Sequence, residues 1–529
     1  MTTYLLALAA VVTVLFAFLT QATEPTRPNA QTHMTTDWPS LRFNFTVKRS
    51  SMQVHRQSDF TILARPVVST DATSVLYDAF ATFTEDATTY NYSLVGGISY
   101  VSFTSPDNMS SLAQCTDSEI LPSISFIVSA LNNATPISSI STSSGRTIEC
   151  YGGKLLKAEV NGIAFGLCFS GSSGLQMYGN DMDIFVEYEK EQVEIKMPIA
   201  EDKCNAVALS SLVTSIGKSL LTGSAISSSP RHLEADFGLG FLLHDDHSCS
   251  CKSTPRPCVF VEGLGALTEK EENVAEDPYW GNLTKHAPCC SSMEYVILNT
   301  VNNSWANASQ QQKVCDHLLA VNEANQKSII SDTIIVTHSM GSLLLAGAIA
   351  NGECSLAKST SWVATAAPMR GSMASDYFQN SCKDDTNFIM EKLIERTGYC
   401  PADDGIKSLA YENESYSTPE LNAAYAAAQV AYRKNIYASL CSNGYSGLPS
   451  NRQVAYWVLG TVVNHKSFKN DGMVEFYSCA GGFPESKFGN RYHDRFYVTE
   501  LNHADTAFRH GDALFNKAKM PVKWFECVL

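Results

Sequence analysis

The chain has 529 residues, in which 38 Lys and Arg are outnumbered by 53 Asp and Glu, for a formal net charge of −15. A chain of this length can bury a large core and form two or three domains. An acidic protein repels phosphate backbones, and the sequence contains no basic stripe that would bind one. We therefore expect no nucleic-acid partner.

An apolar block at residues 5–19 opens the chain, interrupted only by Thr13. A membrane span needs about 20 apolar residues, so this length is more typical of a signal-peptide core. Thr20 and Ala22 supply small residues for a cleavage site. We expect a signal peptide at residues 1–22. An uncleaved signal anchor is the alternative, because no positive side chain precedes the block.

The cysteine content indicates an oxidising compartment. The chain has 16 Cys without a zinc-type spacing, which favours disulfides. Adjacent Cys289 and Cys290 should bond to different partners. Sequons of the form Asn-x-Ser/Thr occur at Asn44, Asn91, Asn108, Asn133, Asn282, Asn302, Asn307 and Asn413. Together these features predict a glycosylated protein that is secreted or lies in the lumen of the secretory pathway.

Residues 23–204 are predicted to form an antiparallel β-rich domain. From about residue 37 they are rich in Ser, Thr, Val, Ile and Tyr, with turn residues at short spacing. Its four cysteines could form two bridges: Cys115, Cys150, Cys168 and Cys204. No polar constellation there suggests chemistry.

Residues 205–257 are predicted to be a Cys-containing linker. The run from His244 to Cys251 mixes possible metal ligands, but it lacks the CxxC and HxxxH spacings of metal sites. We expect neither a metal nor a cofactor.

From Cys258 the pattern changes, and apolar runs of strand length alternate with helical stretches. This alternation predicts βαβ units, and hence an α/β domain at residues 258–529 with a doubly wound, mostly parallel sheet. The expected strands are residues 259–261, 295–298, 333–336, 362–365, 454–459 and 496–498.

The sequence Thr-His-Ser-Met-Gly at 337–341 follows a β-branched run and precedes the small-residue helix 343–350. A serine on a sharp strand-to-helix turn is typical of a nucleophile elbow. The turn exposes the hydroxyl, and the helix N-terminus favours the negative charge of the reaction. We predict Ser339 as the nucleophile.

A nucleophilic serine needs a histidine base and an orienting carboxylate. In doubly wound sheets these follow later strands, in the order Ser, Asp, His. Asp471 and His503 fall in that order, in Asn-Asp-Gly-Met-Val and Asn-His-Ala-Asp. We predict that Asp471 fixes the tautomer of His503 and that His503 takes the serine proton. His338 and His510 are the competing histidines.

Two backbone N–H groups must bind the oxyanion. One should belong to Met340, the residue after the serine. The other should belong to Leu264, in the Glu-Gly-Leu-Gly stretch that follows the first strand of the domain.

Together these motifs resemble the α/β-hydrolase superfamily, specifically its lipases and esterases. Residues 259–265 resemble the His-Gly-Leu-Gly oxyanion stretch, with Glu262 in the histidine position, and Thr337 occupies the first glycine position of the serine motif. The acid and histidine segments are similar to those of bacterial triacylglycerol lipases. In that family the aspartate two residues after the histidine helps to bind calcium, and this position is Asp505 here, but the sequence offers no second carboxylate partner for the ion. The serine and oxyanion motifs also resemble deacylases of inositol in glycosylphosphatidylinositol anchors.

The resemblance also implies a cap or lid insertion at about residues 372–450, which would either cover the substrate or serve only as scaffold. It predicts a serine hydrolase of acyl or lipid esters that makes transient contact with a membrane or lipid interface. Acyl transfer, thioester hydrolysis and inositol deacylation are alternatives at the same site. A catalytically silent extracellular binding protein is an alternative of another class, motivated by Glu262 and Thr337.

Overall fold

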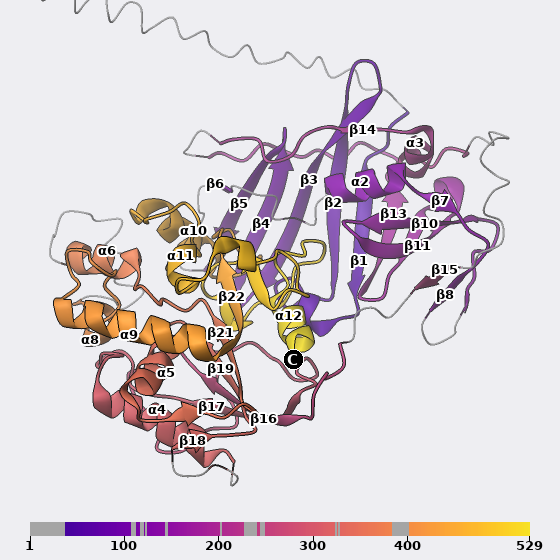
Figure 1. Cartoon of the computed structure of the whole chain (residues 1–529). Coiled ribbons are helices and arrows are strands. Elements are labelled where there is room, and N and C mark those ends of the chain that lie inside the picture. Colours follow the sequence, from indigo (N-terminus) through magenta and orange to yellow (C-terminus); the bar gives the residue numbers. More distant parts are fainter. Residues whose placement is uncertain are drawn as a thin grey trace, which may run out of the picture.

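The computed structural model describes residues 37–106, 113–116, 121, 124–142, 147–200, 204–226, 241–243, 249–322, 325, 328–382 and 401–529. The predicted signal peptide lies outside these residues. Within them, no helix is both long enough and apolar enough to span a bilayer. The described chain is built around two large sheets, one antiparallel and one parallel (Figure 1).

The N-terminal part forms a twelve-stranded antiparallel sheet, as the alternating pattern predicted. In β1 (Leu41–Val47), alternate side chains beginning with Leu41 are buried, and the polar ones between them point away from the core. The strand order is β6-β5-β4-β3-β2-β1-β13-β12-β11-β10-β7, with β14 pairing β3. The other strands are β2 (Asp59–Val68), β3 (Ser74–Glu85), β4 (Thr88–Val95), β5 (Ile98–Thr104), β6 (Gln114–Cys115), β7 (Thr135–Pro136), β10 (Lys154–Val160), β11 (Ile163–Phe169), β12 (Leu175–Tyr178), β13 (Met182–Tyr188) and β14 (Ser211–Leu212).

Smaller elements accompany this sheet. They are the helices α2 (Ile124–Asn132) and α3 (Ser215–Thr222), the 3-10 turn η1 (Ser50–Met52), and a small sheet of β8 (Ile140–Thr142), β9 (Thr147–Ile148) and β15 (Phe241–Leu243).

The C-terminal part contains a six-stranded sheet in which every neighbouring pair is parallel. In spatial order its strands are β17 (Cys290–Val296), β16 (Arg256–Val261), β19 (Ile334–His338), β21 (Ser361–Thr365), β22 (Ile436–Ser442) and β23 (Phe496–Thr499). The chain therefore runs outward from β16 in both directions. A reversal of strand order of this kind opens a crevice at the carboxyl ends of the two central strands, here β16 and β19.

Three helices cover one face of the parallel sheet: α4 (Ala308–Ala320), α5 (Met340–Asn351) and α9 (Pro419–Asn435). Apolar side chains of the three helices share a core with Val259, Ile335 and Trp362 from the strands. The remaining elements of this part are α6 (Met373–Ser381), α8 (Asp404–Lys407), α10 (Gln453–Val462), α11 (Phe476–Cys479), α12 (Pro521–Val528), the 3-10 turns η3 (Glu485–Lys487) and η4 (Asp505–Ala507), and the short strands β18 (Ile329–Ile330) and β20 (Ser355–Leu356).

The opposite face of the parallel sheet differs from the doubly wound expectation. Phe260 and Val336 share one core with the C-terminal helix α12 and with side chains of the antiparallel sheet. Figure 1 shows α12 between the two sheets. The Phe515 ring lies 6.4 Å from that of Phe45 on β1, and the Phe525 ring 6.0 Å from that of Phe260. The two parts therefore share a hydrophobic core, although their sheets remain distinct.

Two predicted elements differ from the structure. Residues 454–459, predicted as a strand, lie in helix α10. The strand of the sheet is instead β22, inside the segment predicted as a cap insertion at 372–450. A short apolar run fits a buried strand and a buried helix equally well by periodicity, which explains the exchange.

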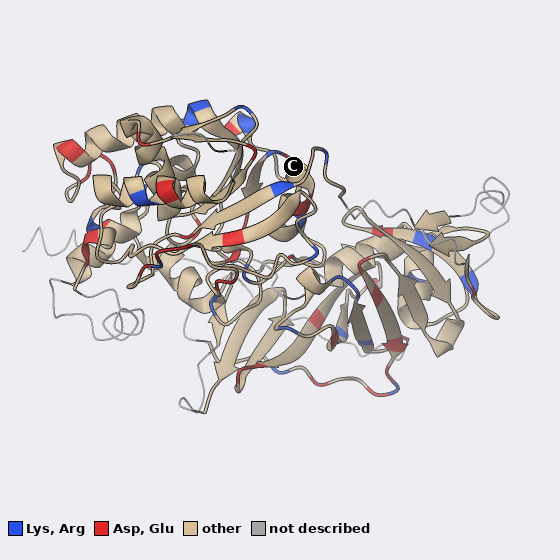
Figure 2. Ribbon diagram, turned by 90° about the horizontal axis from the view of Figure 1, so that it is seen from below, with Lys and Arg blue, Asp and Glu red and all other residues tan. Residues whose placement is uncertain are grey.

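Disulfides join the described cysteines. The pairs are Cys115–Cys204, Cys150–Cys168, Cys249–Cys527, Cys251–Cys289, Cys258–Cys290, Cys315–Cys354 and Cys441–Cys479. The predicted separate partners of Cys289 and Cys290 are confirmed, as are the two bridges within the β-rich part. Such a number of disulfides fits an extracellular or secretory protein. In Figure 2, Lys and Arg are scattered among Asp and Glu along the ribbon of both parts.

Candidate active site

Ser339 lies on the turn between β19 and α5. Its φ of 51° and ψ of −129° are unusual for a residue with a side chain. Its N–H donates to the carbonyl of Thr365 at 3.0 Å, which ties the turn to the neighbouring strand. The strained turn and the following helix N-terminus are the local geometry of a nucleophile elbow.

Glycines allow the loop after β16 to approach this turn. A Cβ on Gly263 would lie 2.7 Å from the Cβ of Ser339, and a Cβ on Gly341 would lie 2.4 Å from the carbonyl oxygen of Glu262. Both contacts are too short for any other residue. The turns after β16 and β19 therefore meet at the crevice, where open α/β sheets bind their ligands.

Ser339, His503 and Asp471 are joined by hydrogen bonds. The distance from His503 Nε2 to Ser339 Oγ is 3.0 Å, and that from His503 Nδ1 to Asp471 Oδ2 is 2.7 Å. All three residues are buried, with His503 8% exposed. The structure thus brings together the three side chains that the sequence singled out.

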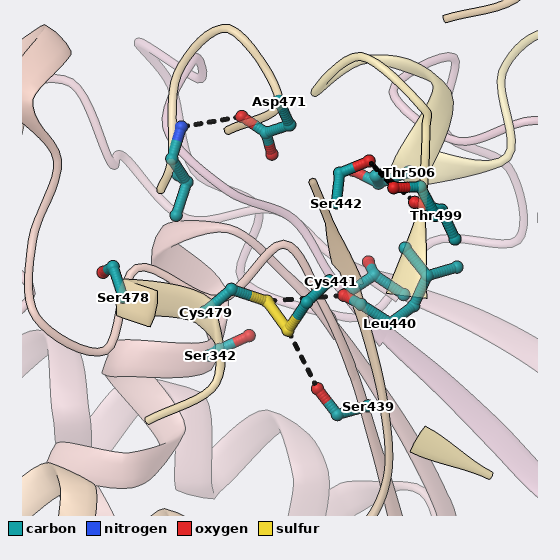
Figure 3. Close-up of a disulfide and its surroundings, with 12 residues drawn as sticks. Ser342, Ser439, Leu440, Cys441, Ser442, Asp471, Ser478, Cys479, Thr499 and Thr506 are labelled. Atoms are coloured by element: carbon teal, nitrogen blue, oxygen red, sulfur yellow. Dashed lines mark hydrogen bonds between the residues drawn. A yellow bond between two sulfur atoms is a disulfide. The ribbon is translucent and has the colours of Figure 1, made fainter. Parts of the chain in front are cut away.

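Backbone donors hold the Asp471 carboxylate on its other oxygen. Oδ1 accepts from the N–H groups of Met473 and Val474 at 2.9 and 2.6 Å, and the Asp471 carbonyl accepts from the N–H of His503 at 2.9 Å. The loop leads into α11, which the Cys441–Cys479 disulfide bonds to β22. Figure 3 shows this bridge, with Asp471 in the loop that precedes Cys479. The position of the carboxylate is therefore fixed from both sides.

The two predicted oxyanion donors flank the serine. Met340 is the first residue of α5, and Leu264 follows Gly263 in the loop that packs on Ser339. Both backbone segments lie at the same edge of the sheet, because each follows the carboxyl end of one of the parallel neighbours β16 and β19.

The two departures from the hydrolase motifs are accommodated differently. Thr337 is fully buried, and its hydroxyl bonds to Ser342 at 2.8 Å and accepts from Trp362 Nε1 at 2.9 Å. The larger side chain at this position therefore fits the turn, with its hydroxyl hydrogen-bonded. Glu262 is 5% exposed, and burial, followed by the nearby Asp277 carboxyl, raises its pKa to about 8. Glu262 is therefore mainly protonated at neutral pH, which limits its electrostatic effect on the site.

The competing histidines have other partners. His510 Nδ1 lies 2.5 Å from Asp505 Oδ1, and the other oxygen of Asp505 accepts from the N–H of Leu448 at 2.7 Å. The described residues contain no cluster of three or more His, Cys, Asp or Glu suited to a metal. Cys249 and Cys251 form disulfides, and residues 244–248 lie outside the described residues.

The sequence did not indicate that Tyr279, His338 and Thr506 form a hydrogen-bonded group next to His503. His338 was considered only as a rival base, yet its Nε2 contacts the carbonyl of His503 at 3.1 Å and Thr506 Oγ1 at 2.9 Å. Its Nδ1 lies 2.5 Å from the hydroxyl of Tyr279. Tyr279 comes from a loop without a recognisable motif, so no local signal could have identified it.

Apolar side chains from α6, α8 and α10 gather above the site. They form one cluster with Leu264, beside the serine, and Met473, two residues after Asp471. Tyr456 of α10 belongs to this cluster, and its ring centroid lies 6.3 Å from that of His503. An apolar cluster therefore lies next to the candidate base and acid.

A cavity of about 1170 Å³ lies elsewhere among the described residues. It lies between the two parts of the molecule, and Phe126, Leu448, Trp457, Phe515 and Lys519 are among its lining residues. Ser339, Asp471 and His503 do not line it. The hydrogen-bonded side chains, and not this cavity, are the candidate active site, because volume alone supplies no reacting group.

Comparison with known proteins gives only distant similarities. No protein-family model matches the sequence, and no curated protein matches it significantly. The solved lipase BlEst2 of Bacillus licheniformis in propeptide form has a TM-score of 0.31 and 13% identity, and the match covers 49% of each chain. This chain thus spans about half of that protein.

Two further solved structures are matched over most of their own length. Staphylococcus hyicus lipase has a TM-score of 0.26 and 15% identity over 53% of this chain and 94% of its own. Haloalkane dehalogenase DbeA of Bradyrhizobium elkani has a TM-score of 0.23 and 15% identity, over 40% of this chain and 80% of its own. Scores below 0.5 carry no conclusion on activity, and the assignment of function rests on the site itself.

Proposed function

We propose that this chain is a serine hydrolase of the α/β-hydrolase type that cleaves carboxylic esters with an apolar acyl group. The observation that carries the proposal is the continuous hydrogen-bonded series Ser339, His503 and Asp471 at the crevice of a parallel sheet. Nucleophile, base and orienting carboxylate in this geometry are the requirements of acyl transfer to serine.

In the proposed reaction, Ser339 Oγ attacks the ester carbonyl while its proton passes to His503 Nε2. Asp471 accepts the hydrogen bond from Nδ1–H and stabilises the imidazolium. The N–H groups of Leu264 and Met340 bind the oxyanion. The imidazolium then gives its proton to the departing alcohol oxygen, which leaves an acyl-enzyme. Water attacks this ester, with His503 as base, and releases the carboxylic acid and free Ser339.

The apolar cluster next to the base and acid supports an acyl substrate. Leu264, Tyr456 and Met473 flank the positions of the oxyanion, the base and the acid, and they belong to one cluster with α6 and α10. Each methylene of an acyl chain buried there would contribute about 0.8 kcal/mol to binding. A long-chain ester should therefore be preferred to an acetate ester. Secretion, and transient contact with a lipid interface that presents such esters, are part of this proposal.

Labelling with a fluorophosphonate probe tests the activated serine directly. We expect covalent labelling of the peptide that contains Ser339, and loss of both labelling and esterase activity in Ser339→Ala, with an unchanged melting temperature. Asp471→Asn should retain the fold and lower kcat by about 10³- to 10⁴-fold. Esterase activity retained in Ser339→Ala would refute the proposal. A panel of nitrophenyl esters, alcohol acceptors and thioesters then separates hydrolysis from acyl transfer and thioester cleavage.

The silent binding protein is the competing class, and the same probe decides between the two. Its motivation is weaker once Thr337 has hydrogen-bond partners and Glu262 is buried as a protonated acid. A native chain that takes up no probe would favour the binding protein.

A further inference from the structure

The residue before the proposed nucleophile contacts the backbone of the proposed base. His338 is 2% exposed, and its Nε2 lies 3.1 Å from the carbonyl oxygen of His503 and 2.9 Å from Thr506 Oγ1. Thr506 donates its hydroxyl proton to the same carbonyl at 2.7 Å. Consecutive residues therefore hold His503 at two points, since Ser339 binds its ring and His338 its backbone.

The carbonyl oxygen of His503 determines the direction of both hydrogen bonds of the His338 ring. A carbonyl oxygen can only accept, so Nε2 of His338 must carry a proton. In a neutral imidazole the other nitrogen then has the lone pair, and the Tyr279 hydroxyl must donate to Nδ1 across 2.5 Å. The proton of Tyr279 thus selects the tautomer of His338 that can bind the backbone of His503.

We propose that Tyr279, His338 and Thr506 are positioning residues, which hold the backbone of His503 so that its ring reaches Ser339 and Asp471 together. This inference rests on the proposed hydrolase function and names no new reacting group. Tyr279 is itself anchored, because the guanidinium of Arg509 lies 4.4 Å from its ring centroid and donates to its carbonyl. Tyr279 also lies against Gly263, where a Cβ would come within 2.6 Å of its hydroxyl.

A neutral His338 is required by its place beside the base. The ring centroids of His338 and His503 are 4.7 Å apart, so a charged His338 would oppose formation of the His503 imidazolium. Burial lowers the pKa of His338 well below its usual value, and His503 and Arg509 act in the same direction. The neutral state and the assigned tautomer are therefore consistent.

The positioning residues act on kcat and not on substrate binding, because none of them belongs to the apolar cluster above the crevice. Displacement of a reacting group by about 1 Å can cost about 100-fold in rate. We expect Thr506→Val, which keeps the shape and removes the donor, to lower kcat between about tenfold and 100-fold with KM within about twofold. Thr506→Ser keeps the hydroxyl and should remain close to the native enzyme.

A second pair of variants tests His338. His338→Gln keeps an N–H donor that can reach the His503 carbonyl, whereas His338→Leu removes it. We expect the glutamine variant to retain most of the kcat that the leucine variant loses. Tyr279→Phe should give an intermediate loss of kcat, because the ring stays and only tautomer selection is weakened.

Hydrogen exchange supplies a readout that does not depend on catalysis. The amide N–H of His503 donates to Asp471, and its exchange should accelerate in Thr506→Val and His338→Leu but not in Thr506→Ser. The positioning role is refuted if this exchange and kcat are unchanged in Thr506→Val. It is also refuted if Thr506→Ser and His338→Gln lose as much kcat as their partners. If the native chain has no esterase activity, the proposed function falls while exchange still decides the positioning role.

Discussion

The buried carboxyl of Glu262 should make the stability of this protein depend on pH. Its side chain is 5% exposed, and Oε1 has no hydrogen-bond partner among the described residues. Burial raises the pKa of Glu262 to about 8, and the negative charge of Asp277 adds to the effect, while Arg509 opposes it. A buried acid without a full set of partners is more stable in its neutral form.

The sign of the effect follows from the two states. The ordinary pKa of a glutamate is 4.5, so the unfolded chain loses this proton near that pH, whereas the folded chain keeps it up to about pH 8. The contribution is fully present below pH 4.5 and is lost as the pH rises through about 8. A pKa difference of this size corresponds to roughly 5 kcal/mol, an upper bound for the loss above pH 8.

Glu262→Gln removes the titration and keeps the shape. The variant should match the native protein at pH 4.5 and exceed it increasingly towards pH 9, where the free energy of unfolding should be higher by up to roughly 5 kcal/mol. Urea unfolding with disulfides intact, followed by tryptophan fluorescence at several pH values, measures this difference. A difference that is constant with pH, or a native protein that is more stable than the variant at pH 9, would refute the reasoning.

Glu269→Gln is the matched control. Glu269 is exposed, and its hydrogen bond to Lys313 lowers its pKa, so its contribution is present at neutral pH and is lost on acidification. The control should therefore lose stability at neutral pH, by less than about 1 kcal/mol, and should show no gain at pH 9.

Three further predictions concern the framework of the site. Gly341→Ala should cost about 1–3 kcal/mol of stability in thermal melts, because the new Cβ would lie 2.4 Å from a backbone carbonyl oxygen of the loop after β16. Replacing Cys441 and Cys479 together by Ala opens a loop of 38 residues and should lower the free energy of unfolding by about 4 kcal/mol. Asp181→Ala leaves the buried Lys523 without its carboxylate at 3.2 Å, and should cost about 3–5 kcal/mol.

Each of these has a result that would contradict it. Native stability in Gly341→Ala would mean that the loop after β16 can move away without cost. An unchanged denaturation midpoint in the cysteine variant would mean that the loop is restrained by other contacts. For Asp181→Ala, urea unfolding should show one shifted transition, and a change confined to a separate transition would argue against the shared core.

The site was easier to predict from the sequence than the arrangement of the sheets. Ser339, Asp471 and His503 each stand in a short motif whose turn chemistry is local, and their order along the chain is the one that doubly wound sheets use. That order was sufficient even though the strand predicted before Asp471 is helix α10. The exchange between β22 and α10 had no such local signal. Both segments are short and apolar, and only their pairing partners distinguish them.

The shared core was not predictable, because it depends on contacts between the ends of the chain. Arg49, which follows β1, contacts Glu526 of α12, 477 residues away. No periodicity or composition in either segment indicates this partner. The sequence therefore predicted two consecutive domains, while the structure has two sheets that bury apolar surface against each other.

Contacts of this kind also connect the N-terminal part to the segment that follows His503. The segment after His503 runs to Asp512, whose N–H donates to the carbonyl of Ser51 in η1. Asp512 Oδ2 accepts from the Ser51 hydroxyl at 2.7 Å, and Oδ1 accepts from the N–H of Val522 at the start of α12. Asp512, at the end of the segment that follows His503, is therefore held by the antiparallel part through Ser51 and by α12 through Val522. The β-rich part thus supports the loop that carries His503, although it contributes none of the proposed reacting groups.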